Sequence, residues 1–331
     1  MGKIQTISTA GMSREQWLAE RRKGVGGSDV GAILGLNPYR TSFFVWADKT
    51  GRLPDKPDNE AMRQGRDLED YVAKRFCEAT GYKVHRVNAI ITNDAYPHLA
   101  CNVDRLISGQ DAGLECKTAS ALSERRYRDG NFPESYYAQC VAYMAVTGRK
   151  RWFLAALVLG RDFKVYQLTR DPEDATPEWC ESSVYVPDEE FAIMRDAVID
   201  FWRYVESDTE PPVDGSPSTT DALGAMYPAS EDGTEIDLSG FTGLLDNYKQ
   251  LKVRAAEIDG MLCETENRLK QYMGDGETGQ WAGGKITWKS QTRRSLDAKR
   301  LGKDHPEIDL DGYYKTTHVR PFKVTFAKED N

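Results

Sequence analysis

The chain of 331 residues lacks the long apolar runs that mark membrane proteins. No stretch approaches the roughly 20 consecutive apolar residues that a membrane-spanning helix needs. The N-terminus also lacks the apolar stretch of a secretory signal. We therefore expect a cytoplasmic protein with no membrane partner. A chain of this length suits one large domain or two smaller ones, and either can bury a sizeable core.

Metal-binding patterns built from cysteine and histidine are also absent. The six cysteines form no CxxC pair, and the four histidines are too scattered for a zinc site. The cysteine spacing likewise argues against an iron–sulfur cluster. We expect reduced thiols that act as small hydrophobic side chains in a cytosolic protein.

The net charge of −8 argues against a nucleic-acid-binding protein until its distribution is considered. Residues 171–210 carry 13 acidic and 2 basic side chains, so the acidity is local. Basic clusters lie at 21–23, 125–128 and 149–151, and residues 285–303 hold seven basic side chains and one acidic. Several basic surfaces therefore remain for phosphate groups, although a charge run is usually a solvated face.

Helical and strand patterns alternate over the first two thirds of the chain. Apolar spacing and capping residues predict helices at 14–22, 28–34, 42–49, 59–80, 134–147 and 188–206. Short runs bounded by turn residues predict strands at 82–92, 98–107, 113–118, 151–159 and 163–169. This order predicts an α/β or α+β core within residues 1–210, with a central mixed sheet flanked by helices.

The last third of the chain follows a different pattern. Proline, glycine, serine and threonine residues at 211–239 predict a linker. Over 248–272, apolar residues recur in alternating steps of three and four, which is the a/d repeat of a coiled coil. Glycines at 283–284 predict a β-hairpin, and alternation at 322–326 predicts a final strand. We expect residues 240–331 to form a helical hairpin or a coiled-coil arm with a small β unit.

Asp104 and the segment Glu115-Cys116-Lys117, eleven residues further on, carry the most informative pattern. Because side chains alternate on a strand, Glu115 and Lys117 share one face and Cys116 points to the other. A hairpin-like connection at 108–112 returns the chain beside Asp104. Two carboxylates and an ammonium group then converge.

This combination suits the hydrolysis of phosphodiesters. Two carboxylates and the backbone carbonyl of Cys116 are oxygen ligands for a hard divalent cation, Mg²⁺ foremost with Mn²⁺ as a substitute. The metal acidifies bound water, while Lys117 orients that water and stabilises developing charge. Alone, the pattern D-x10-E-x-K is weak, since a structural ion pair gives the same letters. The apolar neighbours of Glu115 favour a site, because buried ionised groups need a partner or a metal.

Three further polar residues are candidates for the same site. Glu69 lies at the edge of the apolar stripe of its helix, as a metal or water ligand or as the partner of Arg66 or Arg105. Gln139 and Tyr143 lie one helical turn apart on the helix after the predicted active strand. They line the cleft, or they simply pack on the sheet.

A candidate anion site lies near the N-terminus. The Gly26-Gly27-Ser28-Asp29 turn opens a helix and exposes backbone N–H groups, which bind anions. Arg21 can clamp the same phosphate through its planar guanidinium group. The alternative is a capped helix beside a solvent-facing arginine.

In their order and spacing, five blocks resemble the YqaJ-type viral recombinases, relatives of phage lambda exonuclease within the PD-(D/E)XK nuclease superfamily. The resemblance runs over roughly residues 13–170. It is carried by Trp17-x3-Arg21-x2-Gly24-Val25-Gly26-Gly27-Ser28-Asp29, Gly65-x3-Glu69, Leu99-Ala100-x3-Asp104, Leu114-Glu115-Cys116-Lys117 and Tyr137-x-Gln139-x3-Tyr143.

The resemblance implies a PD-(D/E)XK, restriction-endonuclease-like core with Mg²⁺-dependent exonuclease activity. Such an enzyme degrades linear duplex DNA from the 5′ end and leaves a 3′ single strand for phage-type recombination by strand annealing. It also implies a ring-shaped homotrimer, a single-strand annealing protein as partner and, for a phage protein, the host cytoplasm.

By the same resemblance, residues take three roles. The catalytic residues would be Glu69, Asp104, Glu115, Lys117 and Gln139; the metal ligands Asp104, Glu115, Cys116 and Glu69; and the 5′-phosphate or DNA contacts Arg21, Ser28 and Tyr143.

The sequence departs from the family pattern in two respects, and two other functions are alternatives to this interpretation. Cys116 occupies a position where an aliphatic residue is expected, and the coiled-coil arm, an addition to the minimal core, puts a simple ring in doubt. An endonuclease of the same superfamily, for restriction or junction cleavage, would not need to grip a terminal phosphate. A non-catalytic DNA-binding scaffold would bind no divalent metal at these carboxylates.

Overall fold

The computed structural model describes residues 2–54, 59–309, 311–313, 315, 317 and 320–325. The chain forms two compact units, Met1–Pro228 and Ala229–Asn331. The first unit holds every residue proposed above for catalysis or phosphate binding. None of the described helices combines the length and apolar character that crossing a membrane requires.

A six-stranded sheet is the centre of the first unit. Its strands follow the order β2-β5-β6-β7-β8-β9. Their bounds are Val84–Arg86, Arg105–Ile107, Ala112–Ala119, Arg151–Val158, Asp162–Thr169 and Ser182–Tyr185. The pairs β6/β7 and β8/β9 are parallel and the remaining pairs are antiparallel. The predicted mixed sheet is confirmed.

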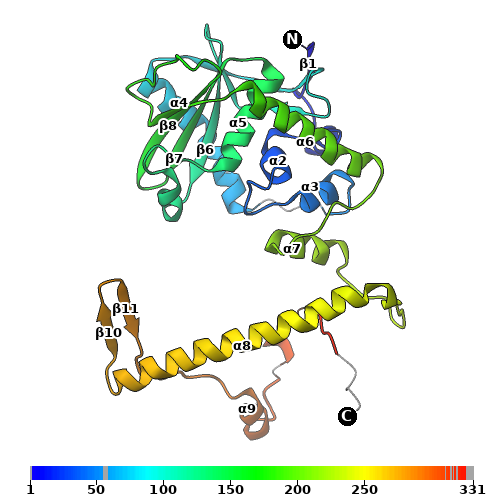
Figure 1. The fold of residues 1–331 in the computed structure, drawn as a ribbon, viewed down its shortest axis with the longest axis vertical. Helices are drawn as coiled ribbons and strands as arrows, with labels where there is room; N and C mark the ends of the chain where they lie inside the picture. Colours follow the sequence, from blue (N-terminus) through cyan, green and yellow to red (C-terminus); the bar gives the residue numbers. More distant parts are fainter. Residues whose placement is uncertain are drawn as a thin grey trace. The chain divides into compact units, whose positions relative to one another are not determined.

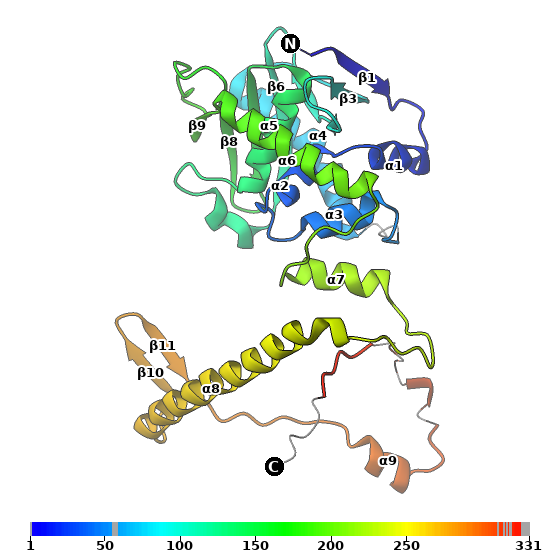
Figure 2. The same ribbon diagram turned by 45° about the vertical axis from the view of Figure 1, so that its right-hand side comes forward.

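Helices cover both faces of this sheet (Figures 1 and 2). The helices of the first unit are α1 Arg14–Arg22, α2 Gly27–Ile33, α3 Ser42–Lys49, α4 Glu60–Thr80, α5 Glu134–Thr147, α6 Asp188–Glu206 and α7 Pro217–Met226. Strand β7 shows the two layers most clearly, since its buried side chains alternate. Trp152 and Leu154 belong to the core cluster of α2, α3, α5 and α6, whereas Phe153 packs with Val72 and Phe76 of α4.

A second sheet of three strands lies beside the first and corrects two of the predicted strands. It pairs β1 (Ile4–Ser8), β3 (Ala89–Asn93) and β4 (Ala100–Asn102). The predicted single strands at 82–92 and 98–107 each split, with one half in each sheet. Alternation predicts an extended chain but not the bend that moves it between sheets. Strand β1 gave no signal because all five of its residues are exposed.

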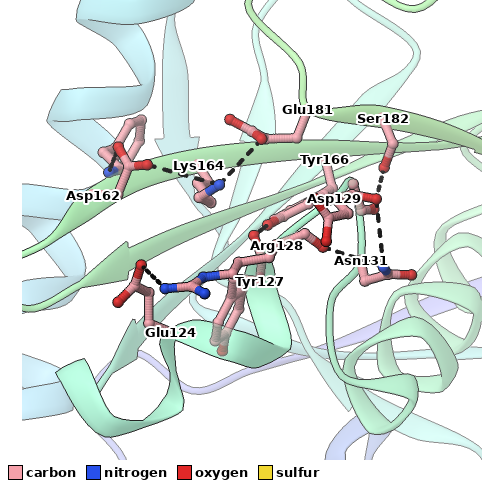
Figure 3. Close-up of polar contacts among 12 residues, drawn as sticks. Glu124, Tyr127, Arg128, Asp129, Asn131, Asp162, Lys164, Tyr166, Glu181 and Ser182 are labelled. Atoms are coloured by element: carbon pink, nitrogen blue, oxygen red, sulfur yellow. Dashed lines mark hydrogen bonds and ion pairs between the residues drawn. The ribbon is translucent and has the colours of Figure 1, made fainter. Parts of the chain in front are cut away.

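The connection from β6 to α5 is anchored to the far strands of the large sheet (Figure 3). It includes the 3-10 helix Ala121–Tyr127. The Tyr166 hydroxyl on β8 donates to the Tyr127 carbonyl oxygen at 3.0 Å, and Ser182 Oγ on β9 donates to the Gly130 carbonyl oxygen at 2.7 Å. These bonds fix the start of α5 relative to the sheet.

Helix α7 lies within 211–239, where the composition predicted a linker. Ser216 caps it by accepting a hydrogen bond from the Thr219 backbone N–H, and Pro217 occupies its first turn. The Thr219 hydroxyl lies 3.1 Å from that of Thr41, at the start of α3. A serine followed by proline is a known start of a helix. The sequence therefore contained a signal for this helix, but the polar composition around it favoured a linker.

The second unit is built around one long helix. Its elements are η2 Ser239–Phe241, α8 Thr242–Met273, the hairpin of β10 Thr278–Trp281 and β11 Gly284–Thr287, α9 Ala298–Asp304 and η3 Asp311–Tyr313. The predicted long helix and hairpin are confirmed. Residues 322–325 are not in a strand, so the predicted final strand is wrong over that stretch. Its last residue, Phe326, lies outside the described residues.

Candidate active site

Strand β6 presents Glu115 and Lys117 to helix α5, on the face opposite α4. Leu114 and Cys116 point the other way and pack with the cluster around α4. Glu115 is 2% exposed, and its Oε1 accepts a hydrogen bond from Gln139 Nε2 of α5 at 2.9 Å. The strict alternation of a strand thus places one carboxylate and one ammonium group in the layer between sheet and helix.

Asp104 joins them through the pairing of β5 with β6. The antiparallel register sets Arg105 opposite Leu114, so the preceding residue, Asp104, falls opposite Glu115. Asp104 Oδ2 accepts the backbone N–H of Cys116 at 2.9 Å. The predicted convergence of Asp104, Glu115 and Lys117 is therefore present.

Lys117 is held in its charged form by this cluster. Its Nζ lies 2.5 Å from Glu115 Oε1 and 4.7 Å from the centre of the Tyr136 ring. Burial alone would lower the pKa of Lys117, but the neighbouring Glu115 carboxylate outweighs it and raises that pKa. An ammonium group that keeps its proton can donate hydrogen bonds and stabilise negative charge, but it cannot act as a general base.

The two carboxylates exceed what one lysine can neutralise. Burial, and then the charge of Glu115, raise the pKa of Asp104 to about 8. Glu115 Oε2 is buried and has no hydrogen-bond partner among the described residues. A buried carboxylate oxygen without a partner is costly, and a cation would relieve that cost. The donor set of Asp104, Glu115 and the Cys116 carbonyl contains oxygen atoms only, which suits a hard divalent ion.

The structure does not bring Glu69 to these donors. Arg105 Nη1 donates to Glu69 Oε1 at 2.6 Å, and the same guanidinium binds Asp70 at 2.6 Å. Because Arg105 is 4% exposed, it needs such partners. Across the described residues, no group of three or more His, Cys, Asp or Glu side chains could hold a metal. Glu69 is therefore paired with Arg105, the alternative that the sequence left open, and its role as a metal or water ligand stays a prediction.

Cys116 could bind a metal through its backbone carbonyl but not through its thiol. Burial, followed by the charges of Asp104 and Glu115, raises the pKa of the Cys116 thiol well above its ordinary value. A protonated thiol is a poor metal ligand. Only the carbonyl oxygen of Cys116 remains as a donor, so an aliphatic residue could replace it there.

Gln139 connects the carboxylate cluster to a cavity that Tyr143 lines. Its Nε2 reaches both Glu115 Oε1, at 2.9 Å, and the Tyr143 hydroxyl, at 2.6 Å. Gln139 and Tyr143 are both buried on α5, one turn apart. The two residues therefore lie at the sheet-facing side of the helix, where the sequence left cleft lining and simple packing open.

This cavity, of about 130 Å³, is lined by all three residues that the sequence predicted to contact phosphate. It is lined by Trp17, Arg21, Gly26, Gly27, Ser28, Ala100, Asn102 and Tyr143. The Arg21 guanidinium stacks on Trp17, with its carbon 4.8 Å from the ring centre. A Cβ on Gly27 would lie 2.4 Å from Tyr143 Cε1, so only glycine allows this turn to approach the tyrosine. We refer to this cavity as the end pocket.

A buried ion-pair network supports the turn that forms the end pocket. Asp29 is 1% exposed and lies 2.9 Å from Lys49 Nζ and 3.2 Å from Arg40 Nη1. Its Oδ2 also accepts the backbone N–H of Gly26 at 3.1 Å. Burial alone would raise the pKa of Asp29, but Lys49, then Arg40 and Arg21, hold it at about 2.

A larger groove of about 910 Å³ shares Trp17 and Arg21 with the end pocket. Half of its lining residues are basic or aromatic, and most of the others are apolar. The basic residues are Arg14, Arg21, Arg22, Arg40, Lys49 and Arg66, the acidic ones Asp48 and Asp221, and the aromatic ones Trp17, Tyr39 and Phe44. Such a lining complements phosphate groups and unpaired bases.

Two residues at these sites escaped the sequence interpretation. Asn102 lines the end pocket, and it precedes Asp104 by two residues. Tyr136 lies under Lys117, and it precedes Gln139 by three residues on α5. Tyr136 lies on the same side of α5 as Gln139, so helical spacing could have found it. Asn102 ends β4, before the bend that leads to Asp104 and β5, so strand alternation could not place it.

We predict that Asp29→Asn lowers the free energy of unfolding by about 3–5 kcal/mol at neutral pH, because it leaves Lys49 buried without its partner. The folded-state pKa of Asp29, about 2, lies below the ordinary 3.8, so its contribution is complete above pH 3.8 and is lost as the pH falls toward 2. Denaturant unfolding of both proteins at neutral and acidic pH measures this.

The matched control is Asp67→Asn, whose carboxylate pairs with Arg63 at the surface, with both side chains more than two-thirds exposed. Its effect should stay within about 1 kcal/mol. A deficit for Asp29→Asn that is no larger than the control's, or that does not shrink in acid, would show that the network does not stabilise the fold in this way.

Comparisons with known proteins find relatives of this chain. Residues 16–150 match the YqaJ-like viral recombinase domain. The chain is 36% identical over 319 residues to the uncharacterized protein YqaJ of Bacillus subtilis (strain 168), covering 95% of this chain and 94% of that protein. It is also 35% identical over 77 residues to protein D345L of African swine fever virus (strain Badajoz 1971 Vero-adapted), 22% of each chain.

The chain also resembles a solved structure, at lower sequence identity than these relatives. An alkaline exonuclease (LHK-Exo) from Laribacter hongkongensis aligns with 59% of this chain and 93% of its own. The sequence identity is 20% and the TM-score is 0.46.

Proposed function

The chain belongs to the family of the YqaJ-like viral recombinase domain, and on that premise we propose that it is a metal-dependent exonuclease acting on 5′ ends of duplex DNA. One observation carries the proposal. The buried cluster of Asp104, Glu115 and Lys117 is joined by Gln139 to the end pocket that holds Arg21. A hydrolytic centre and an anion site thus lie at the two ends of one hydrogen-bonded chain.

The residues of the cluster divide the chemistry between them. The carboxylates of Asp104 and Glu115 and the carbonyl of Cys116 would hold Mg²⁺, with Mn²⁺ as a substitute. When bound, the ion supplies a more acidic water and neutralises charge on the phosphate group. Lys117, which stays protonated, donates hydrogen bonds to the attacking water or to the phosphoryl oxygen. Gln139 fixes the orientation of the Glu115 carboxylate.

The end pocket supports action at a strand terminus. Its volume of about 130 Å³ suits a phosphate group and is too small for a base pair. Arg21 provides a planar, permanently charged guanidinium group, and Ser28 adds a hydroxyl at the start of α2. An endonuclease of the same superfamily would not need to bind a terminal phosphate in a small pocket of this kind. We therefore assign the pocket to the terminal 5′ phosphate and the direction of digestion to 5′→3′.

The wider role follows from this direction. Removal of the 5′ strand leaves a 3′ single strand, which is the substrate for recombination by strand annealing. We propose an annealing protein as partner, and a catalytic part within residues 1–210 followed by an arm at 240–331. The basic groove beside the end pocket would contact the DNA backbone.

We predict that Lys117→Ala lowers the rate of Mg²⁺-dependent digestion of linear duplex DNA about 10²–10³-fold, the effect of removing one donor from a transition-state site. A time course of nucleotide release at saturating DNA measures this. The matched control is Lys164→Ala. Lys164 lies on β8 between Asp162 and Glu181, at 3.7 and 3.2 Å, and takes no part in the cluster (Figure 3). Equal effects of the two substitutions would contradict the assignment.

The 5′ phosphate gives a second prediction. Digestion should prefer 5′-phosphorylated over 5′-hydroxyl linear duplexes and should spare covalently closed circles. Arg21→Ala should remove most of the phosphate preference, while Arg203→Ala on the exposed side of α6 should keep it. Cleavage of circles as fast as of linear DNA would identify an endonuclease instead.

Metal binding is the third prediction. Titration calorimetry with Mn²⁺ or Mg²⁺ should detect binding to the wild type and to Glu69→Gln, because Arg105 occupies Glu69. The pair of substitutions Asp104→Asn and Glu115→Gln should abolish it. A wild type that binds neither ion would favour the non-catalytic scaffold.

A further inference from the structure

Helix α8 carries a continuous apolar stripe that the described part of the second unit leaves uncovered. The stripe consists of the a and d positions Leu244, Tyr248, Leu251, Ala255, Ile258, Leu262, Thr265, Leu269 and Tyr272. No residue of this 32-residue helix is buried. Leu251, Ile258 and Leu262, near its middle, are 52%, 58% and 57% exposed. Such a stripe, about 44 Å of helix long, is costly in water unless a partner covers it.

We propose that α8 binds α8 of a second copy of this chain as a parallel, in-register coiled coil. The spacing of the stripe points to a helix as the partner. Steps of three and four average 3.5 residues, which keeps the contact in line along a supercoiled helix of the same repeat. A helix that packs on a globular core usually shows a broader stripe. The positions beside this one carry charges, among them Lys252, Arg254, Asp259, Glu266 and Arg268.

The flanking charges form a complementary contact in a parallel pair. In a parallel pair, a g position faces the e position of the next heptad on the other helix. Arg254 at g then faces Asp259 at e of the second copy, and the same contact occurs twice by symmetry. Among the described residues, neither Arg254 nor Asp259 has an ion-pair partner within its own chain.

An antiparallel pair would make different contacts. Each a position would face a d position of the other helix, so that Ala255 would face Ile258 or Thr265, according to the register. The g positions would face g positions, so Arg254 would not meet Asp259. Thr265 would not face Thr265 of the second copy in either register.

Cysteine cross-linking of the full chain tests this arrangement. Cys263 is exposed and is first replaced by serine. In the parallel coil, Thr265 at a d position faces Thr265 of the second copy, so Thr265→Cys should give a disulfide-linked dimer under mild oxidation. The matched control is Asn267→Cys at an outward f position, which should stay monomeric on a non-reducing gel.

Two results would overturn the proposal. One is a cross-link that requires mixing Ala255→Cys protein with Ile258→Cys or Thr265→Cys protein, which marks an antiparallel pair. The other is a monomer in sedimentation velocity at micromolar concentration, which means that something other than a second copy covers the stripe.

A matched pair of substitutions separates association from folding of the helix. Leu262→Asp puts a carboxylate in the stripe and should raise the dissociation constant roughly tenfold or more. Val253→Asp makes the same change at an f position, where Val253 is 55% exposed, and should leave association unchanged. Equal weakening by both would mean that loss of helix, and not loss of the coil, explains the effect. The readouts do not depend on nuclease activity, so they stand even if the proposed function fails.

Discussion

A carboxylate that leaves water needs compensating groups, and the arrangement of the first unit follows from how Glu115 obtains them. Lys117 supplies a charge from the same strand face, and Gln139 supplies a hydrogen bond from the helix that covers that face. One carboxylate oxygen is left without a partner, beside a second buried carboxylate. The sheet and α5 thus enclose a negatively charged site that water does not neutralise, which is the condition for binding a divalent cation tightly.

The end pocket also depends on a buried carboxylate, but here neighbouring cationic side chains neutralise its charge. Asp29 is buried and compensated twice over, by Lys49 and Arg40, and it fixes the turn that carries Gly26 and Gly27. Arg21 remains beside this turn, stacked on an aromatic ring, and faces the cavity. In the proposed function, Glu115 would help to hold a cation, and Asp29 would stabilise the turn beside the site for an anion. A phosphodiester substrate with its metal requires both.

The sequence predicted the parts of this site that depend on local geometry. Strand alternation was enough to pair Glu115 with Lys117, and helical spacing was enough to pair Gln139 with Tyr143. It did not predict the partner of Glu69, because the choice between Arg105 and a metal depends on how α4 sits against β5. The same limit explains the strands at 82–92 and 98–107, whose bends between two sheets depend on long-range pairing and leave no periodic trace.

The contact between Gln139 and Tyr143 has an energetic consequence for the carboxylate cluster and the end pocket. Glu115, Gln139, Tyr143 and the Gly27 turn form one unbroken series of contacts, and the middle two residues belong to a single helical turn. A shift of α5 would move these two residues together. The free-energy effects of substitutions at the two ends of this series should therefore not be additive, as expected for residues in one hydrogen-bonded network. The cluster and the pocket are thus coupled through one helical turn, although one is built on carboxylates and the other on a guanidinium group.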